Sequence, residues 1–251
     1  MKSFVTKYGI FDIFNNDTVN LKYLSKGMIP DQDLIEKHLI DYLLKSSILI
    51  NVGSGIGGHD LLFTKINPSI SIYSFEPREE YFYLLSKNIS KNNIDNVIIL
   101  NNALGHITGP VEFSNDNNTI YDYNDLIEIN LGTLISNTKT YHILTLDSLH
   151  LLQCNILFID LDGFAYTVLI GGIKTIKKFK PIICYRNVTS ILPFIRQENN
   201  SCKELLEKME YTILEYNDFI IAKPVVLNID LSESTKIQNL VNISDNLISD
   251  V

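Results

Sequence analysis

The sequence predicts an α/β fold whose sheet is mostly parallel and is closed by an antiparallel hairpin. Apolar, strand-like runs alternate with helical patterns along the chain, and the last two runs, 211–215 and 219–222, flank a turn. A β-hairpin and a helix come before this alternation. We therefore expect a core domain over residues 47–223, an N-terminal hairpin and helix packed on it over residues 1–46, and a C-terminal tail or accessory helix over residues 224–251.

Length and composition fit one soluble domain. The chain has 251 residues, of which 45% are hydrophobic, and this is enough for a single sizeable core. Its net charge of −8 argues against a nucleic-acid-binding protein, because phosphate binding needs a basic surface. There is no signal peptide or membrane-spanning run, and the three cysteines form neither a zinc pattern nor a disulfide framework. We expect a cytoplasmic protein with no metal site, no nucleic-acid partner and no membrane partner; homo-oligomerisation stays open.

The N-terminal unit is predicted from alternation and then from helical spacing. Apolar and polar residues alternate between Phe4 and Leu24 around the turn-forming segment 15–17, which predicts a hairpin centred there. Asp31 precedes a run with one apolar face at helical spacing. We expect Asp31 to cap that helix.

A glycine-rich turn organises the core domain. The apolar run Ile48–Ile50 breaks into Gly53, Gly55, Gly57 and Gly58, after which a helical pattern begins. Glycine accepts positive φ and lets a ligand approach the backbone N–H groups, and the helix N-terminus adds unsatisfied donors. The turn fits two templates, a dinucleotide-binding fingerprint with glycines at 53, 55 and 58 and an S-adenosylmethionine-binding motif with glycines at 53, 55 and 57.

The remaining elements follow in alternation. Strands and helices are expected at 71–75, 81–89, 97–101, 156–160, 168–176, 181–185 and 202–209. Glu76 ends the second core strand, where a carboxylate can accept both ribose hydroxyls of a nucleotide-like ligand. The aperiodic segment 115–141 predicts a substrate-side lid or a flexible insertion. The terminal antiparallel hairpin favours a methyltransferase-type sheet over a dinucleotide enzyme.

Six sequence blocks together resemble the FkbM-type methyltransferase family, in that family's order and spacing. They are NVGSGIG, FEP, NNALG, LTLDSL, FIDLDGFAYTVLIGG and KPII, and the resemblance extends over about residues 8–223. The resemblance implies a Rossmann-like, class I methyltransferase fold, S-adenosylmethionine as the methyl donor, and O-methylation of a hydroxyl on a sugar, sugar nucleotide or glycan. The residues that we expect to bind the cofactor are Asn51, Gly53, Gly55, Gly57, Glu76, Asn102 and Ala103.

Five positions depart from the family pattern. Family members usually carry Asp where this chain has Asn51 and Lys where it has Phe158. They usually carry Glu at the positions of Asp162, Ala165 and Arg186. These departures support an alternative in which the protein is a catalytically impaired binding or scaffold module. A nicotinamide-dependent oxidoreductase is a third, weaker alternative.

The catalytic candidates are Asp160, then His59, with Arg186 orienting the acceptor. Asp160 and Asp162 end the fourth core strand, where one of them could take the hydroxyl proton or bind a metal that does so, or both could cap the next helix. His59 follows the glycine turn, with partial exposure and no chemistry as its alternative. Arg186 ends the fifth core strand, and it either clamps an anionic substrate or forms an ion pair with Asp160 or Asp162.

Overall fold

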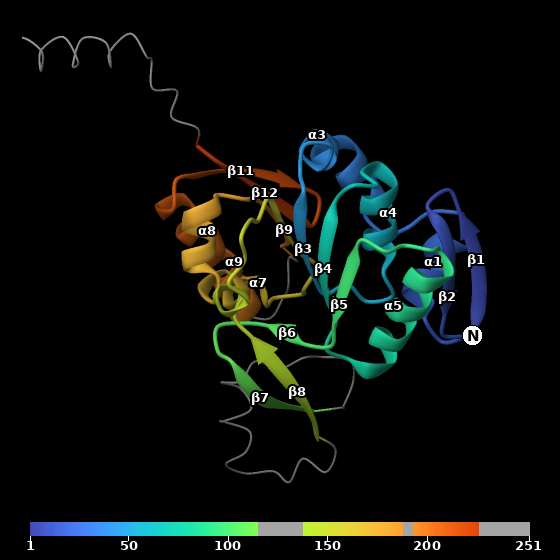
Figure 1. Ribbon diagram of the computed structural model, residues 1–251. Coiled ribbons are helices and arrows are strands. Elements are labelled where there is room, and N and C mark those ends of the chain that lie inside the picture. Colours follow the sequence, from blue (N-terminus) through green and yellow to red (C-terminus); the bar gives the residue numbers. More distant parts are fainter. Residues whose placement is uncertain (115–137, 188–192, 226–251) are drawn as a thin grey trace, which may run out of the picture.

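A seven-stranded mixed sheet forms the centre of the computed structural model, which describes residues 1–114, 138–187 and 193–225 (Figure 1). Five parallel strands are followed by the closing antiparallel hairpin, and the spatial order is β11-β12-β10-β9-β3-β4-β5. The strands are β3 (Ile48–Val52), β4 (Ser71–Phe75), β5 (Val97–Leu100), β9 (Ile156–Ile159), β10 (Ile182–Arg186), β11 (Tyr211–Tyr216) and β12 (Phe219–Pro224). The predicted sheet and its closing hairpin are confirmed.

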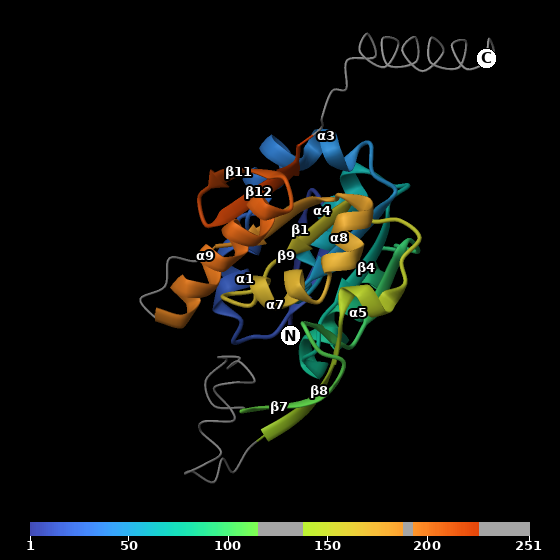
Figure 2. The same ribbon diagram turned by 90° about the vertical axis from the view of Figure 1, so that its left-hand side faces the viewer.

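Helices cover both faces of this sheet, which explains why its central strands β3 and β9 are buried and, apart from Asn51, apolar (Figures 1 and 2). On one face lie α4 (Gly58–Ile66) and α5 (Glu79–Lys91), whose buried residues form one core cluster with the N-terminal unit. On the other face lie α7 (Ala165–Ile170), α8 (Ile173–Phe179) and α9 (Pro193–Lys208). The carboxyl ends of the parallel strands therefore meet at one edge, where side chains from different strands come together.

The N-terminal hairpin turns earlier than the sequence predicts. Strands β1 (Lys2–Thr6) and β2 (Gly9–Ile13) pair across Lys7 and Tyr8, so the predicted turn at 15–17 is wrong. Asp17 instead caps helix α1 (Thr18–Leu24), where its side chain accepts a hydrogen bond from the backbone N–H of Asn20. Asparagine and aspartate favour both hairpin turns and helix N-caps, which is why the same residues suggested the wrong element.

The segment after α1 holds a second correction. Its helix consists of α2 (Gln32–Leu34), a π-helical turn (Ile35–Leu39) and α3 (Ile40–Leu43). Asp31 is at the N-cap position, as predicted, with a left-handed backbone, φ 54°, but its side chain makes no capping hydrogen bond. Its carboxylate instead contacts Arg186, at the end of β10.

A small three-stranded sheet projects from one end of the core (Figures 1 and 2). It contains β6 (Ala103–Leu104), β7 (Gly109–Ser114) and β8 (Thr138–Leu144) in the order β6-β8-β7. The predicted lid at 115–141 lies outside the described residues up to 137, and its last residues belong to β8. A short 3-10 helix (Leu146–Leu149) leads from β8 back to the core.

The apolar run after β9 forms two helices rather than one. The break falls at Gly171 and Gly172, between α7 and α8. A Cβ atom on Gly171 would lie 1.9 Å from the backbone oxygen of Gly105, so this close backbone contact requires glycine. Helix α9 also begins earlier than predicted, at Pro193.

Asp12 and Asn88 join the N-terminal hairpin to helix α5. The Asp12 carboxylate, 2% exposed, lies 2.9 Å from Lys87 Nζ and 2.6 Å from Lys91 Nζ and accepts a hydrogen bond from Ser3. The Asn88 side chain accepts from the backbone N–H of Asp12 and donates to the carbonyl oxygens of Asp12 and Ile56. Ile56 belongs to the glycine turn, so Asn88 connects the hairpin to that turn.

We expect Asp12→Asn to lower the free energy of unfolding by about 1–3 kcal/mol, because a buried carboxylate loses charge-assisted hydrogen bonds. Lys91, Ser3 and Lys87 hold the pKa of Asp12 below its ordinary value. The unfolded chain therefore takes up the proton first, and the advantage of the wild type should shrink as pH falls below about 4. Denaturant unfolding at several pH values measures this. Asp33→Asn, which removes an exposed ion pair to Lys37, is the control and should change little.

Candidate active site

The glycine turn between β3 and α4 has the shape of a backbone cradle. Gly53, Gly55 and Gly57 all have positive φ, at 84°, 55° and 87°. A Cβ atom on Gly53 would lie 2.5 Å from the backbone oxygen of Asp160, so the turn packs directly against the end of β9. A Cβ atom on Gly55, by contrast, would meet none of the described residues beyond its chain neighbours within 4 Å. The space next to Gly55 is therefore open to a ligand.

Glu76 faces this turn from the end of β4. Its Oε2 atom accepts a hydrogen bond from the backbone N–H of Gly55 at 3.0 Å. Its Oε1 atom accepts from the backbone N–H and the Nε atom of Arg78, both at 3.0 Å, and the residue is 1% exposed. A ribose that reaches Glu76 would therefore compete with Arg78, whose guanidinium also stacks on Tyr81 at 3.9 Å.

Asn51 lies below the turn and is completely buried. Its Nδ2 atom donates to Asp60 Oδ1 at 2.9 Å, and Ser74 Oγ donates to the same oxygen. Burial raises the pKa of Asp60, although the hydrogen bonds from Ser74 and Asn51 lower it in part. A carboxyl group therefore lies directly beside Asn51, on Asp60 in the first turn of α4, and sequence reasoning missed it.

The other predicted cofactor residues lie where β5 leads into β6. Ala103 pairs with Ile143 of β8, and Asn102 Nδ2 donates to the carbonyl oxygen of His142 at 3.4 Å. Their neighbour Asn101, which we did not predict, donates to the carbonyl oxygens of Glu76 and Pro77. Asn101 therefore fixes the turn that carries the Glu76 carboxylate.

Asp160 and Arg186 meet at the carboxyl ends of β9 and β10. Arg186 Nε donates to Asp160 Oδ1, and Arg186 Nη2 lies 2.6 Å from Asp31 Oδ2. The Asp162 carboxylate is 3.7 Å from Arg186 Nε, and the Phe219 ring lies under the guanidinium at 4.5 Å. Burial alone would lower the pKa of Arg186, but Asp160 and Asp31 outweigh it, and the pKa is raised.

His59 completes this group from the first turn of α4 and is 7% exposed. Its Nε2 atom lies 3.2 Å from the carbonyl oxygen of Pro30. A carbonyl oxygen only accepts hydrogen bonds, so Nε2 carries a proton and the neutral ring has its lone pair on Nδ1. His59 Nδ1 lies 3.6 Å from Asp160 Oδ2, so a proton that arrives on Nδ1 is stabilised by that carboxylate.

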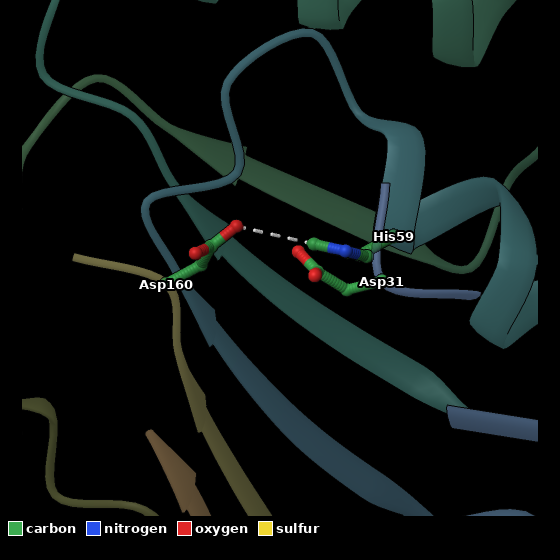
Figure 3. Close-up of side chains that lie close together, drawn as sticks. All are labelled: Asp31, His59 and Asp160. Atoms are coloured by element: carbon green, nitrogen blue, oxygen red, sulfur yellow. Dashed lines mark ion pairs between the residues drawn. The ribbon is translucent and has the colours of Figure 1, made fainter. Parts of the chain in front are cut away.

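Asp31, His59 and Asp160 point toward one another (Figure 3). One ligand atom from each lies within 4.8 Å of the others, a spacing that could hold a metal ion. Both carboxylates, however, are already paired with the Arg186 guanidinium. A cation of the chain itself, Arg186, therefore already contacts both of these acids.

Phe158, Ala165 and Asp162 contribute little polar chemistry here. Phe158 is fully buried, and its ring centroid lies 4.9 Å from that of His59. Ala165 is the first residue of α7 and is buried. The Asp162 side chain is 75% exposed. The family usually has a lysine where this chain has the buried ring of Phe158. It usually has glutamates where this chain has the small Ala165 and the exposed Asp162.

The sequence from residue 51 to residue 233 matches the profile of the methyltransferase FkbM domain, well over half of the chain. The chain belongs to the FkbM methyltransferase family. The resemblance predicted from the six sequence blocks is confirmed, and the family is one of methyltransferases that use S-adenosylmethionine. The glycine turn with open space beside Gly55, and Glu76 facing it, fit this cofactor.

Solved structures with a similar arrangement are distant in sequence. Methyltransferase FkbM from Methylobacillus flagellatus KT gives a TM-score of 0.48 at 13% identity, covering 70% of this chain and 43% of that one. A SAM-dependent methyltransferase from Aquifex aeolicus gives 0.44 at 16% identity, covering 78% and 94%. A SAM-dependent O-methyltransferase from Thermotoga maritima gives 0.43 at 14% identity, covering 79% and 66%. No curated protein matches the sequence.

This FkbM-family chain spans less than half the length of the Methylobacillus protein. Within the described ranges, no helix combines the length and the apolar content that crossing a membrane requires.

Proposed function

We propose that this FkbM-family protein transfers a methyl group from S-adenosylmethionine to a hydroxyl of a sugar, sugar nucleotide or glycan, and that Asp160 with His59 accepts the hydroxyl proton. The pairing of these two side chains beside the glycine turn is the observation that supports it. An O-methyltransferase needs such a proton acceptor near the methyl donor.

The chemistry requires alignment and a base. When bound, the sulfonium of the cofactor supplies an electrophilic methyl group. The acceptor hydroxyl would take this methyl group in place of sulfur, leaving S-adenosylhomocysteine, and its proton would pass to the protein. Holding the reacting atoms in line can contribute about 7–11 kcal/mol, and a base adds about 10²–10⁴-fold.

Asp160 and His59 can share the base role. The Pro30 carbonyl keeps the His59 lone pair on Nδ1, on the side of Asp160. A proton taken by either group is then held between an imidazole nitrogen and a carboxylate oxygen. Arg186 fixes Asp160 Oδ1, so Oδ2 keeps its direction toward His59. The ion pair that we considered as the alternative role of Arg186 is present, and we keep acceptor orientation as its proposed function.

Methyl-transfer assays with labelled S-adenosylmethionine against a panel of free sugars and sugar nucleotides test the proposal. We expect at least one hydroxyl acceptor to be methylated, with the label stable to the conditions that hydrolyse esters. Calorimetric titration with S-adenosylhomocysteine and with NAD provides the control. Submillimolar binding of S-adenosylhomocysteine without any methylated hydroxyl would favour the scaffold alternative, and binding of NAD alone would overturn the proposal.

A further inference from the structure

The acceptor end of the site has a charge pattern that restricts what can bind there. Three carboxylates surround the Arg186 guanidinium. Asp160 is hydrogen-bonded to it, Asp31 lies at 2.6 Å and Asp162 at 3.7 Å. One guanidinium thus faces three carboxylates among the described residues, so the acids outnumber the cation. A phosphate or carboxylate ligand would need the positive charge of Arg186, and that charge is already paired with Asp31 and Asp160.

Asp31 occupies donors of the Arg186 guanidinium that an anionic ligand would otherwise use. If Asp160 were its only close partner, Arg186 would still present its Nη2 edge to a ligand. Asp31 occupies that edge at 2.6 Å (Figure 3 shows its carboxylate facing Asp160). Asp31 comes from the N-terminal unit, ahead of the family domain at residues 51–233. The family match therefore could not reveal it.

The backbone holds Asp31 in place for this role. Ile29, which is 1% exposed, anchors the segment in the core, and the Pro30 carbonyl lies 3.2 Å from His59 Nε2. Asp31 itself adopts a left-handed conformation with φ 54°, and its side chain makes no helix-capping hydrogen bond. Aspartate and asparagine tolerate this conformation better than most residues, so the position combines a rare backbone with a side chain that reaches Arg186.

We propose that Asp31 is a specificity-determining residue, which neutralises Arg186 and makes the site select an acceptor with no negative charge next to the reacting hydroxyl. This inference depends on the proposed methyl transfer to a hydroxyl. A like charge brought against Asp160 and Asp31 is strongly unfavourable in a partly buried site. A neutral polyol or an amino sugar meets no such cost.

Matched acceptors test the inference. Methyl transfer is measured on glucose, galactose and glucosamine and on their monophosphates, with wild type, Asp31→Asn and Asp33→Asn. Asparagine keeps the left-handed backbone and removes only the charge, while Asp33 pairs with Lys37 at the surface. We expect the wild type and Asp33→Asn to prefer the unphosphorylated sugars by more than about tenfold in kcat/KM. For Asp31→Asn we expect that ratio to fall by at least about fivefold.

A second measurement does not depend on activity. The Arg186 Nε–H resonance, assigned by its loss in Arg186→Lys, is followed by NMR while inorganic phosphate is added. Millimolar phosphate should leave the signal unchanged in the wild type and shift it in Asp31→Asn. A preference of the wild type for phosphorylated sugars, a phosphate shift in the wild type, or identical behaviour of Asp31→Asn would overturn the inference. Failure of the proposed function shows separately, as a lack of S-adenosylhomocysteine binding or of any methylated hydroxyl.

Discussion

Asp160→Asn lowers kcat for methyl transfer by about 10²–10⁴-fold, because asparagine cannot take the hydroxyl proton. The amide oxygen can still accept the Arg186 hydrogen bond and the backbone of β9 is unchanged, so the loss reflects the missing base rather than a displaced strand. The measurement is kcat and KM with the best acceptor from the sugar panel, together with S-adenosylhomocysteine affinity, which should stay within about threefold of wild type.

Asp162→Asn is the matched control for this prediction. Asp162 is two residues further on, its side chain is 75% exposed, and it lies 3.7 Å from the same Arg186 nitrogen. We expect kcat to change much less than in Asp160→Asn. His59→Gln should give an intermediate loss, because it removes the ring that shares the proton. If Asp160→Asn keeps the wild-type kcat, then the base lies elsewhere and the proposed mechanism is wrong.

Glu76→Ala weakens S-adenosylhomocysteine binding by at least about 100-fold, because it removes charge-assisted hydrogen bonds, each of which contributes about 1.5–3 kcal/mol. The carboxylate accepts a hydrogen bond from the Gly55 N–H and would accept the ribose hydroxyls in the complex. Calorimetry gives the affinity, and thermal unfolding shows whether each variant is folded.

Two variants separate ribose binding from support of the turn. Glu76→Gln keeps an acceptor for the Gly55 N–H but loses the charge, and we expect a loss of about tenfold. Arg78→Met removes the guanidinium that competes for Oε1. Its S-adenosylhomocysteine affinity should equal or exceed that of wild type. Unchanged affinity in Glu76→Ala would show that the ribose does not use this carboxylate.

The sheet and the glycine turn could be predicted from local sequence patterns, because the residues that mark each element lie close to it in the sequence. The apolar run before Gly53, the carboxylate after β4 and the turn residues before β12 each lie within a few residues of the element that they mark. The same local signals misplaced the first hairpin turn, since the segment 15–17 suits an N-cap as well as a turn.

The site is only partly visible in the sequence because its contacts are long-range. Asp160, His59 and Arg186 could be named from their positions after strands or after the glycine turn. Asp31 could not, since it meets Arg186 across 155 positions and carries the same signal as an ordinary helix cap. Asp60 was missed because the family pattern directs attention to position 51, whereas Asp60 contacts Asn51 from the following helix.

The Asn88 side chain has a thermodynamic consequence for ligand binding. It is hydrogen-bonded to the N–H and the carbonyl oxygen of Asp12 and to the carbonyl oxygen of Ile56. Order in β2 and order in the glycine turn therefore depend on one another. Energetic coupling between two regions is reciprocal. A ligand that rigidifies the turn must therefore also slow amide hydrogen exchange in β2. Conversely, the factor by which the ligand favours ordered β2 is the factor by which its Kd rises when β2 becomes disordered.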